Sequence, residues 1–200
     1  MAKAPVMGRV KSRLAADVGP VRATAFQRSN LAATAARLAG DRRWQTILAV
    51  APDDAVASPM LPFLPRMPQG GGDLGDRMGR VFANFPNTDT LIVGADIAAI
   101  RPSHIASCLK LTRSHGAVLA SSGDGGYWLV GLKAGRRPGS LFDQVRWSTE
   151  YSLADTQVSL RRALRIEPAL GPAREDVDEG PALRRWQATG AMRRVLPVGA

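Results

Sequence analysis

The sequence predicts an α/β sandwich with a mainly parallel central sheet. Short apolar runs of strand length at residues 46–50, 90–94 and 117–120 alternate with longer stretches of helical composition. The 200 residues are 45% hydrophobic, which is enough for one substantial core, and no repeat or low-complexity linker interrupts them. We therefore expect a single domain over residues 1–200, with ligands bound beyond the carboxyl ends of its strands.

The N-terminal half is expected to begin with a loop at residues 3–13. Only two residues precede this loop, so we expect the first strand to be truncated, and a homodimer would cover the sheet edge that is left open. An alanine-rich helix at 21–38 follows, between Gly19-Pro20 and Gly40, and then the buried strand 46–50. Prolines and glycines predict a loop over 52–72, after which Asp73 caps a helix to about residue 85.

The C-terminal half continues the alternation from the strand at 90–94. Pro102 begins a helix, and strands are expected at 117–120 and 127–132. Apolar residues at helical spacing predict a helix near 153–164, with a short strand starting at 165–166 and a last helix opened by Pro181.

Composition excludes several classes of protein. No apolar run reaches the roughly 18 residues that a membrane-spanning helix needs, and no secretory signal is present, so we expect a cytoplasmic protein. The single cysteine, Cys108, excludes an internal disulfide and a thiol metal site. The net charge of +10 comes almost entirely from arginines spread along the chain without interleaved aromatic residues. This pattern favours a diffusely basic surface that attracts nucleotides over a specific nucleic-acid site.

The N-terminal loop has the residue types of a phosphate-binding loop. Gly8 stands among the cations Lys3, Lys11 and Arg13, and glycine lets backbone N–H groups approach a pyrophosphate whose charge Lys and Arg neutralise. A solvated basic terminus explains the same pattern equally well.

Two acidic sites are candidates for metal binding. Asp96 follows the buried strand 90–94, where a carboxylate can hold Mg²⁺ or Mn²⁺ on phosphates. Asp176 and Asp178 lie two residues apart, on the same side if the backbone is extended. The alternative role for each of these aspartates is to cap a helix.

Two glycine-rich runs carry further candidates. In residues 123–128, Asp124, Gly125 and Gly126 precede Tyr127, which indicates either close approach of a ligand to the backbone or a tight hairpin turn. In residues 69–78 a run of glycines enters a helix N-terminus, which favours anions. A flexible surface loop is the alternative for that second run.

Taken in order, the motifs KAPVMGRVKSRL, QGGGDLGDRM, LIVGAD, GDGGYWLVGL, VRWSTEYSLADT and DVDEGPAL are more specific than any one of them. Together they resemble a bacterial family of GT-A-fold glycosyltransferases, or nucleotide-diphospho-sugar transferases, some of them linked to arsenosugar biosynthesis. The same superfamily contains nucleotidyltransferases similar to 2-phospholactate guanylyltransferase. The resemblance covers nearly the whole chain and implies a GT-A-type sandwich.

The resemblance also implies roles for individual residues. Asp96 with Asp176 or Asp178 would hold the metal, and Lys11 and Arg13 would act on the leaving group, with Asp124 as a base or acceptor-orienting group. The nucleotide would be bound by Lys3, Gly8, Lys11, Arg13, Asp76 and Arg77. The acceptor side would be formed by Gly125, Gly126, Tyr127, Trp147, Ser148 and Thr149.

The chain departs from the family pattern at two places. It has Met7 and Ser12 where the family usually has Pro and Thr, and residues 97–99 replace a usual Pro-Gly after the metal-binding acid. The second departure bears on the geometry of the acceptor site.

We therefore expect a metal-dependent transferase that passes a sugar from a nucleoside diphosphate to a small acceptor. Nucleotidyl transfer with release of pyrophosphate is the first alternative. A non-catalytic nucleotide-binding module and nonspecific nucleic-acid binding through the arginines are the others; the last of these would weaken steeply with salt.

Overall fold

The computed structural model describes residues 1–8, 10–97, 100–136, 139, 141–174 and 180–188. Its contacts divide the chain into two compact units. The first unit consists of Met1–Pro68, Ala95–Pro102 and Asp176–Ala200, and the second consists of Gln69–Gly94 and Ser103–Glu175. Each unit is described by itself, and the single domain over the whole chain stays a prediction.

The first unit contains a parallel three-stranded sheet. Its strands β1 (Ala2–Lys3), β2 (Leu48–Ala51) and β3 (Arg66–Pro68) are ordered β1-β2-β3, with Ala2 opposite Val50. The predicted strand 46–50 is confirmed as β2. The loop prediction for 52–72 is wrong in part, because this stretch holds the short helix η1 (Asp53–Ala55) and β3. A three-residue edge strand that ends in proline leaves no periodic pattern to read.

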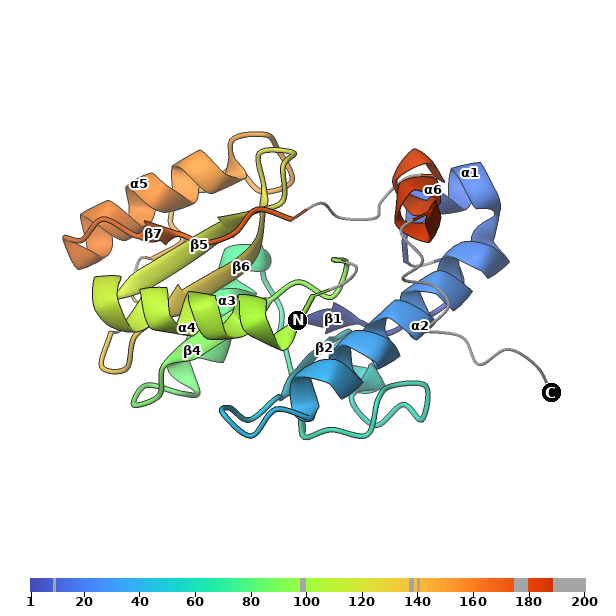
Figure 1. The fold of residues 1–200 in the computed structure, drawn as a ribbon, viewed down its shortest axis with the longest axis horizontal. Coiled ribbons are helices and arrows are strands. Elements are labelled where there is room, and N and C mark those ends of the chain that lie inside the picture. The colour runs from blue at the N-terminus through green and yellow to red at the C-terminus, as the bar shows by residue number, and fades with distance from the viewer. Residues whose placement is uncertain (9, 98–99, 137–138, 140, 175–179, 189–200) are drawn as a thin grey trace. The chain divides into compact units, whose positions relative to one another are not determined.

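Three helices complete the first unit. The predicted alanine-rich helix is confirmed as α2 (Pro20–Ala39), and α6 (Gly180–Ala188) begins close to the predicted Pro181. The helix α1 (Ser12–Val18) was not expected beyond the loop. Leu14 of α1, Ala23 of α2 and Leu183 of α6 form one buried cluster, so the three helices pack together around it (Figure 1). The backbone N–H of Gly180 donates to Asp17 Oδ2 at 2.7 Å, which ties the start of α6 to α1.

The second unit contains a four-stranded sheet ordered β4-β6-β5-β7. Its strands are β4 (Thr90–Val93), β5 (Ala117–Ser121), β6 (Tyr127–Leu132) and β7 (Ala169–Leu170). Strand β6 runs antiparallel to both neighbours, whereas β7 is parallel to β5. The short strand lies later than the predicted 165–166, because Arg165 has the left-handed conformation (φ 53°) that ends the preceding helix.

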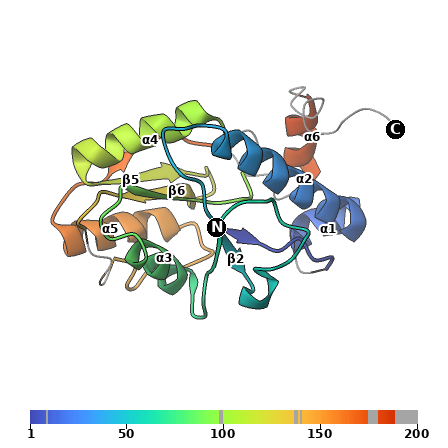
Figure 2. The ribbon, with the colours of Figure 1, turned by 90° about the horizontal axis from the view of Figure 1, so that it is seen from below.

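Helices cover both faces of this four-stranded sheet. Helix α4 (Pro102–His115) lies on one face, and α3 (Leu74–Ala83) and α5 (Ser152–Leu164) lie on the other (Figure 2). The core between them holds Leu119, Leu129 and Leu160, which are 0% exposed. Cys108 is equally buried, and burial raises the pKa of its thiol to about 11, so it is a packing residue.

The predicted α/β class with a mainly parallel sheet is confirmed, since three of the five strand pairs are parallel. Among the helices of the described residues, none has the length and apolar character to cross a membrane.

Candidate functional site

The N-terminal loop of the first unit has an open backbone. Gly8 has φ +77°, and a Cβ placed on it would meet nothing within 4 Å. Lys11 also has a left-handed backbone (φ 51°) and is the N-cap of α1, so the loop turns sharply into the helix. The side chains of Lys3 and Arg13 are exposed. The loop therefore presents its glycine to solvent between two exposed cations, Lys3 at the end of β1 and Arg13 at the start of α1.

Lys11 and Asp96 form the central contact of this loop. Their atoms Nζ and Oδ1 lie 3.5 Å apart, and the lysine side chain is 2% exposed whereas the aspartate side chain is 57% exposed. Asp96 follows β4 in the sequence but belongs to the first unit, as Lys11 does. The structure thus joins the candidate phosphate loop to the candidate metal-binding acid. A buried ammonium beside a solvent-facing carboxylate keeps its charge compensated.

Arg13 lines a separate cavity of about 570 Å³ in the first unit. The other residues lining it are Ala16, Asp17, Pro181 and Arg184. The lining holds two arginines against one aspartate, so its formal charge is positive.

Of the three predicted metal ligands, only Asp96 lies within the described residues. Asp176 and Asp178 lie outside the described residues. Within the part of the chain that the structure describes, no three His, Cys, Asp or Glu side chains are grouped as metal ligands. The Asp96 carboxylate is exposed and is the kind of hard oxygen donor that Mg²⁺ and Mn²⁺ prefer, and its role as a metal ligand stays a prediction, as do those of Asp176 and Asp178.

In the second unit, Asp124 organises the turn between β5 and β6. Its Oδ1 accepts hydrogen bonds from Ser122 Oγ at 2.6 Å and from the backbone N–H of Gly126 at 3.0 Å. A Cβ on Gly126 would lie 2.9 Å from Ser122 Oγ and 3.1 Å from Asp124 Oδ1. These contacts are those of the hairpin turn, which the sequence had left as the alternative.

Gly125 lies against the backbone of another part of the chain, at Glu150. It has φ +84°, and a Cβ on it would lie 2.5 Å from Glu150 Cα. Its carbonyl accepts a hydrogen bond from the backbone N–H of Leu153 at 2.9 Å. The backbone next to Gly125 is therefore contacted by the chain at Glu150, and the predicted approach of a ligand to this turn stays a prediction.

Tyr127 lies in β6 with its hydroxyl between two helices. The hydroxyl is 3.9 Å from Met78 Sδ of α3 and 3.4 Å from Thr156 Oγ1 of α5. Burial raises the pKa of this phenol. Tyr127 thus has the contacts of a core residue, and its predicted place on the acceptor side stays a prediction.

The segment 146–150 is held in place by an ion pair and a set of turns. Arg146 donates from Nε to Asp155 Oδ2 at 2.8 Å and from Nη2 to Oδ1 at 2.9 Å. These hydrogen bonds lower the pKa of Asp155 to about 2. Thr149 Oγ1 donates to the Arg146 carbonyl at 2.8 Å, and Ser148 has a left-handed backbone (φ 60°).

Trp147 of this segment packs against aromatic residues. Its ring centroid lies 6.1 Å from that of Phe142, which in turn lies 6.3 Å from that of Phe82. A Cβ on Gly75 would lie 2.9 Å from the indole, so the helix α3 also contacts Trp147. The buried indole Nε1 makes no hydrogen bond within the described residues.

At the start of α3, where the sequence predicted anion binding, side chains of the helix itself accept hydrogen bonds from backbone N–H groups. Asp73 Oδ1 accepts from the backbone N–H of Asp76 at 2.9 Å, and Asp76 Oδ2 accepts from that of Asp73 at 3.0 Å. This is a capping box, which confirms Asp73 as the cap. Arg77 Nε donates to the Gly72 carbonyl at 3.0 Å, and Arg80 Nη2 donates to that of Gly71 at 3.1 Å. The glycine run is therefore an ordered loop held by arginines.

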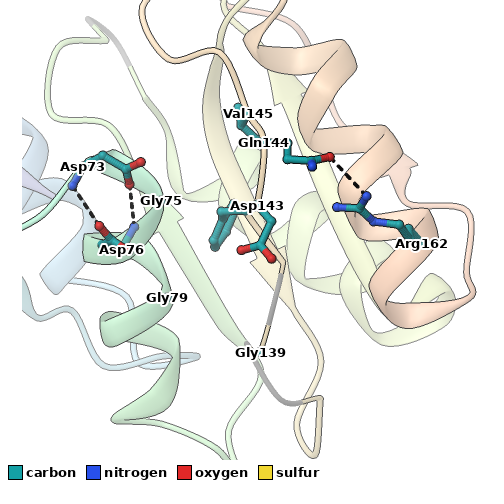
Figure 3. Close-up of a pocket in the computed structure, with 10 residues that line it drawn as sticks. Asp73, Gly75, Asp76, Gly79, Gly139, Asp143, Gln144, Val145 and Arg162 are labelled. Carbon is teal, nitrogen blue, oxygen red and sulfur yellow. Dashed lines mark hydrogen bonds between the residues drawn. The ribbon is translucent and has the colours of Figure 1, made fainter.

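The start of α3 also forms one wall of a cavity of about 930 Å³ within the second unit (Figure 3). Phe142, Asp143 and Val145 contribute from the loop before α5, and Arg162 contributes from α5 itself. Figure 3 shows the Asp143 carboxylate between the hydrogen-bonded pair Asp73–Asp76 and the pair Gln144–Arg162. Gly79 lines the cavity, and a Cβ on it would meet nothing within 4 Å. The cavity carries three carboxylates and one guanidinium.

The structure therefore brings together two sets of predicted residues, one in each unit. Lys11 meets Asp96 in the first unit, and the turn at 124–126 meets the segment 146–150 in the second. The sequence did not indicate Asp143 and Arg162, which line the cavity of the second unit. It also did not indicate Asn30 of α2, whose Nδ2 donates to the carbonyls of Ala95 and Ile97 beside Asp96. Asn30 gave one signal, because it is an amide on an alanine-rich helix face.

The chain is similar to proteins of known structure. One crystal structure, of a "putative nucleotide-diphospho-sugar transferase" from Desulfovibrio desulfuricans G20, superposes with a TM-score of 0.84 at 26% identity. The match covers 94% of this chain and 84% of that one, so the two share their fold. No curated protein sequence matches this chain. A bacterial family profile matches residues 34–149, which is more than half of the chain. The chain therefore belongs to the family described as "Uncharacterized protein conserved in bacteria (DUF2064)".

Proposed function

We propose that this protein is a metal-dependent glycosyltransferase. It binds a nucleoside-diphosphate sugar and passes the sugar to a small acceptor. Two findings support the proposal: the fold is shared with a structure that is described as a nucleotide-diphospho-sugar transferase, and Lys11 lies beside Asp96. The second finding carries it, because the resemblance assigns the phosphates to the N-terminal loop and the metal to this aspartate.

In this proposal the cations of the N-terminal loop act on the diphosphate. Charge builds up on the β-phosphate as the bond to the sugar breaks, and fixed cations stabilise that charge. Arg13 is exposed, so its guanidinium is open to a phosphate from solvent. Lys11 is almost fully covered, so a phosphate contacts its ammonium by displacing part of that cover, of which Asp96 is one element.

A divalent cation completes the proposed site. Mg²⁺ or Mn²⁺ would be bound by Asp96, whose carboxylate is a hard oxygen ligand with a 57% exposed side chain. When bound, such an ion neutralises phosphate charge. Bound phosphates, water or the predicted ligands Asp176 and Asp178 would complete its coordination.

The proposed acceptor pocket is the cavity of about 930 Å³ in the second unit. Its three carboxylates accept hydrogen bonds from hydroxyl groups, and their excess over Arg162 disfavours an anion. Phe142, backed by Trp147, supplies an apolar surface. This lining suits an uncharged, polyhydroxylated acceptor. Asp124 does not line this cavity; the resemblance alone proposes it as the acceptor-orienting group or base, in addition to its contacts in the turn.

Nucleotide binding to Lys11→Met tests the proposal. Titration calorimetry with UDP, GDP and ADP in the presence of Mn²⁺ should show binding of at least one of them to the parent protein. The variant should lose about 1.5–3 kcal/mol of that binding, the contribution of a charged hydrogen bond. Lys110→Met removes the same charge from the exposed face of α4 and should bind as the parent does. Equal affinity of all three proteins would reject the role of Lys11.

A further inference from the structure

Asn30 of α2 reaches both sides of Asp96. Its Nδ2 donates to the carbonyl of Ala95 at 3.0 Å and to the carbonyl of Ile97 at 3.4 Å. Asn30 itself is 2% exposed, so these hydrogen bonds lie in a desolvated place. Hydrogen bonds of this kind are costly to lose, because the carbonyls left behind find no water.

The two carbonyls are those of the residues that flank Asp96. The backbone N–H of Ala95 is fixed as well, since it donates to the Met1 carbonyl at 3.1 Å, and Ile97 is 2% exposed. The backbone of Asp96 is thus held on both sides, while its carboxylate faces solvent and Lys11. A loop carboxylate that is fixed against a helix loses little conformational entropy when a ligand binds to it.

The geometry points to Asn30 as the residue that positions Asp96. Because Asp96 helps to cover the Lys11 side chain, Asn30 also controls how accessible that side chain is. The part of this inference that concerns turnover rests on the proposed function, whereas the part that concerns the Asp96 turn does not. An amide suits the position because its NH₂ group has two donors for two carbonyls. An aspartate would place a carboxylate against two carbonyl oxygens, and a leucine would leave both carbonyls without a donor.

Gln27 provides a matched control on the same helix. It lies one turn before Asn30, is also 2% exposed, and its Oε1 makes no hydrogen bond within the described residues. Replacing it with leucine removes a buried amide without leaving a bonded partner behind. Gln27→Leu should therefore leave the Asp96 turn unchanged.

The accessibility of the Lys11 amine reports the position of the Asp96 turn without any substrate. The amines are acetylated under limiting reagent, and the rate at each lysine is followed by peptide mass spectrometry. In the parent protein Lys11 should react slowly, because its side chain is 2% exposed, whereas Lys3 and Lys110 are exposed and should react fast. Asn30→Leu should raise the Lys11 rate about tenfold, the effect of about 1.4 kcal/mol of lost hydrogen bonding. Asp96→Ala should raise it too, and Gln27→Leu should not.

Two results would overturn the inference. One is a Lys11 rate in Asn30→Leu equal to that of the parent, and the other is a rise shared by every lysine, which reports general loosening. If circular dichroism shows that the leucine variant is unfolded, Asn30→Ser, with one donor of shorter reach, is judged by the same two criteria.

The turnover of nucleotide sugars forms the second arm. Asn30→Leu should lower kcat more than it raises KM, because the substrate still binds to the loop while Asp96 is misplaced. If the labelling result holds but neither protein acts on nucleotide sugars, the proposed function fails and the positioning of Asp96 stands. If turnover is present and unchanged in the variant, the part of the inference that concerns turnover is rejected, and the Lys11 labelling rate alone decides whether Asn30 positions the Asp96 turn.

Discussion

No side chain fits between Gly125 and the backbone of Glu150. A Cβ on Gly125 would lie 2.5 Å from the Cα of Glu150, and the Gly125 carbonyl accepts from the backbone N–H of Leu153 at 2.9 Å. The turn between β5 and β6 is therefore packed against the segment that leads into α5. The GDGG motif at 123–126 and the segment that contains the RWST motif at 146–149 therefore pack against each other.

Gly125→Ala should destabilise the protein more than Gly123→Ala. Both glycines have positive φ, +84° and +92°, so both substitutions strain the backbone. A Cβ on Gly123 meets nothing within 4 Å, so only Gly125→Ala adds a steric conflict, of about 1–3 kcal/mol. Urea denaturation of the two variants measures the difference. Equal losses of stability would show that Glu150 does not pack against the turn in solution.

The variant Asp124→Asn distinguishes a structural role of Asp124 in the turn from a role in catalysis. The substitution keeps an acceptor oxygen for Ser122 Oγ and the Gly126 N–H, so the melting temperature should change little. If the carboxylate also orients the acceptor, kcat should fall on the order of 10²-fold or more while nucleotide affinity is kept. Parallel measurements of melting and of steady-state kinetics give both quantities. A lower melting temperature with unchanged kinetics would assign Asp124 to the turn alone.

The ion pair of Arg146 and Asp155 makes stability depend on pH in the acid range. The pKa of Asp155 is lowered from 3.8 to about 2 by hydrogen bonds from Arg146. A lowered folded-state pKa means that the stabilisation is complete above about pH 4 and is lost as the pH falls toward 2. The difference in melting temperature between the parent and Asp155→Asn should therefore shrink below pH 4.

Asp143→Asn is the control for this pH dependence. The Asp143 carboxylate is exposed and makes neither a hydrogen bond nor an ion pair within the described residues. Its substitution should shift the melting temperature by a small amount that does not follow this pH course. A difference for Asp155→Asn that stayed constant down to pH 2 would contradict the assigned pKa.

Gly79 allows the proposed acceptor pocket to be filled. Gly79→Leu places a side chain where a Cβ meets nothing within 4 Å, so it should occupy the cavity without disturbing the core. Transfer to small sugars and polyols should fall relative to hydrolysis of the nucleotide sugar by water. Gly79→Ala is the control, because it should gain about 0.5–1 kcal/mol of helix stability and leave the cavity open. An unchanged transfer-to-hydrolysis ratio in Gly79→Leu would place the acceptor elsewhere.

The sequence predicted the elements whose local signals are strong. Pro102 begins α4, and Asp73 caps α3 through a capping box with Asp76. The strand β3 was missed, because Arg66–Pro68 has neither length nor alternation. The position of β7 was misjudged, because the left-handed residue that ends α5 is Arg165, whereas the usual sequence signal for this conformation is a glycine.

In the candidate site, the sequence predicted features that depend on local patterns but not the contacts between residues that are distant in the chain. The glycines at 125 and 126 indicated either close approach of a ligand or a tight turn, but the sequence could not say that Glu150 lies against Gly125. Asn30 could not be assigned a role, because its partners at 95 and 97 are far away along the chain. The resemblance implied a phosphate role for Lys11 and a metal role for Asp96, but nothing in the sequence predicted the contact between the two side chains.

The identity of the product formed from a nucleotide sugar tests the central claim most directly. The protein is incubated with Mn²⁺, a panel of nucleoside-diphosphate sugars and small polyol acceptors, and the products are separated by ion-exchange chromatography. We expect release of a nucleoside diphosphate together with a glycosylated acceptor, and a loss of both products in Asp96→Asn. Release of pyrophosphate from a nucleoside triphosphate, with no diphosphate from any nucleotide sugar, would contradict the claim and identify a nucleotidyltransferase.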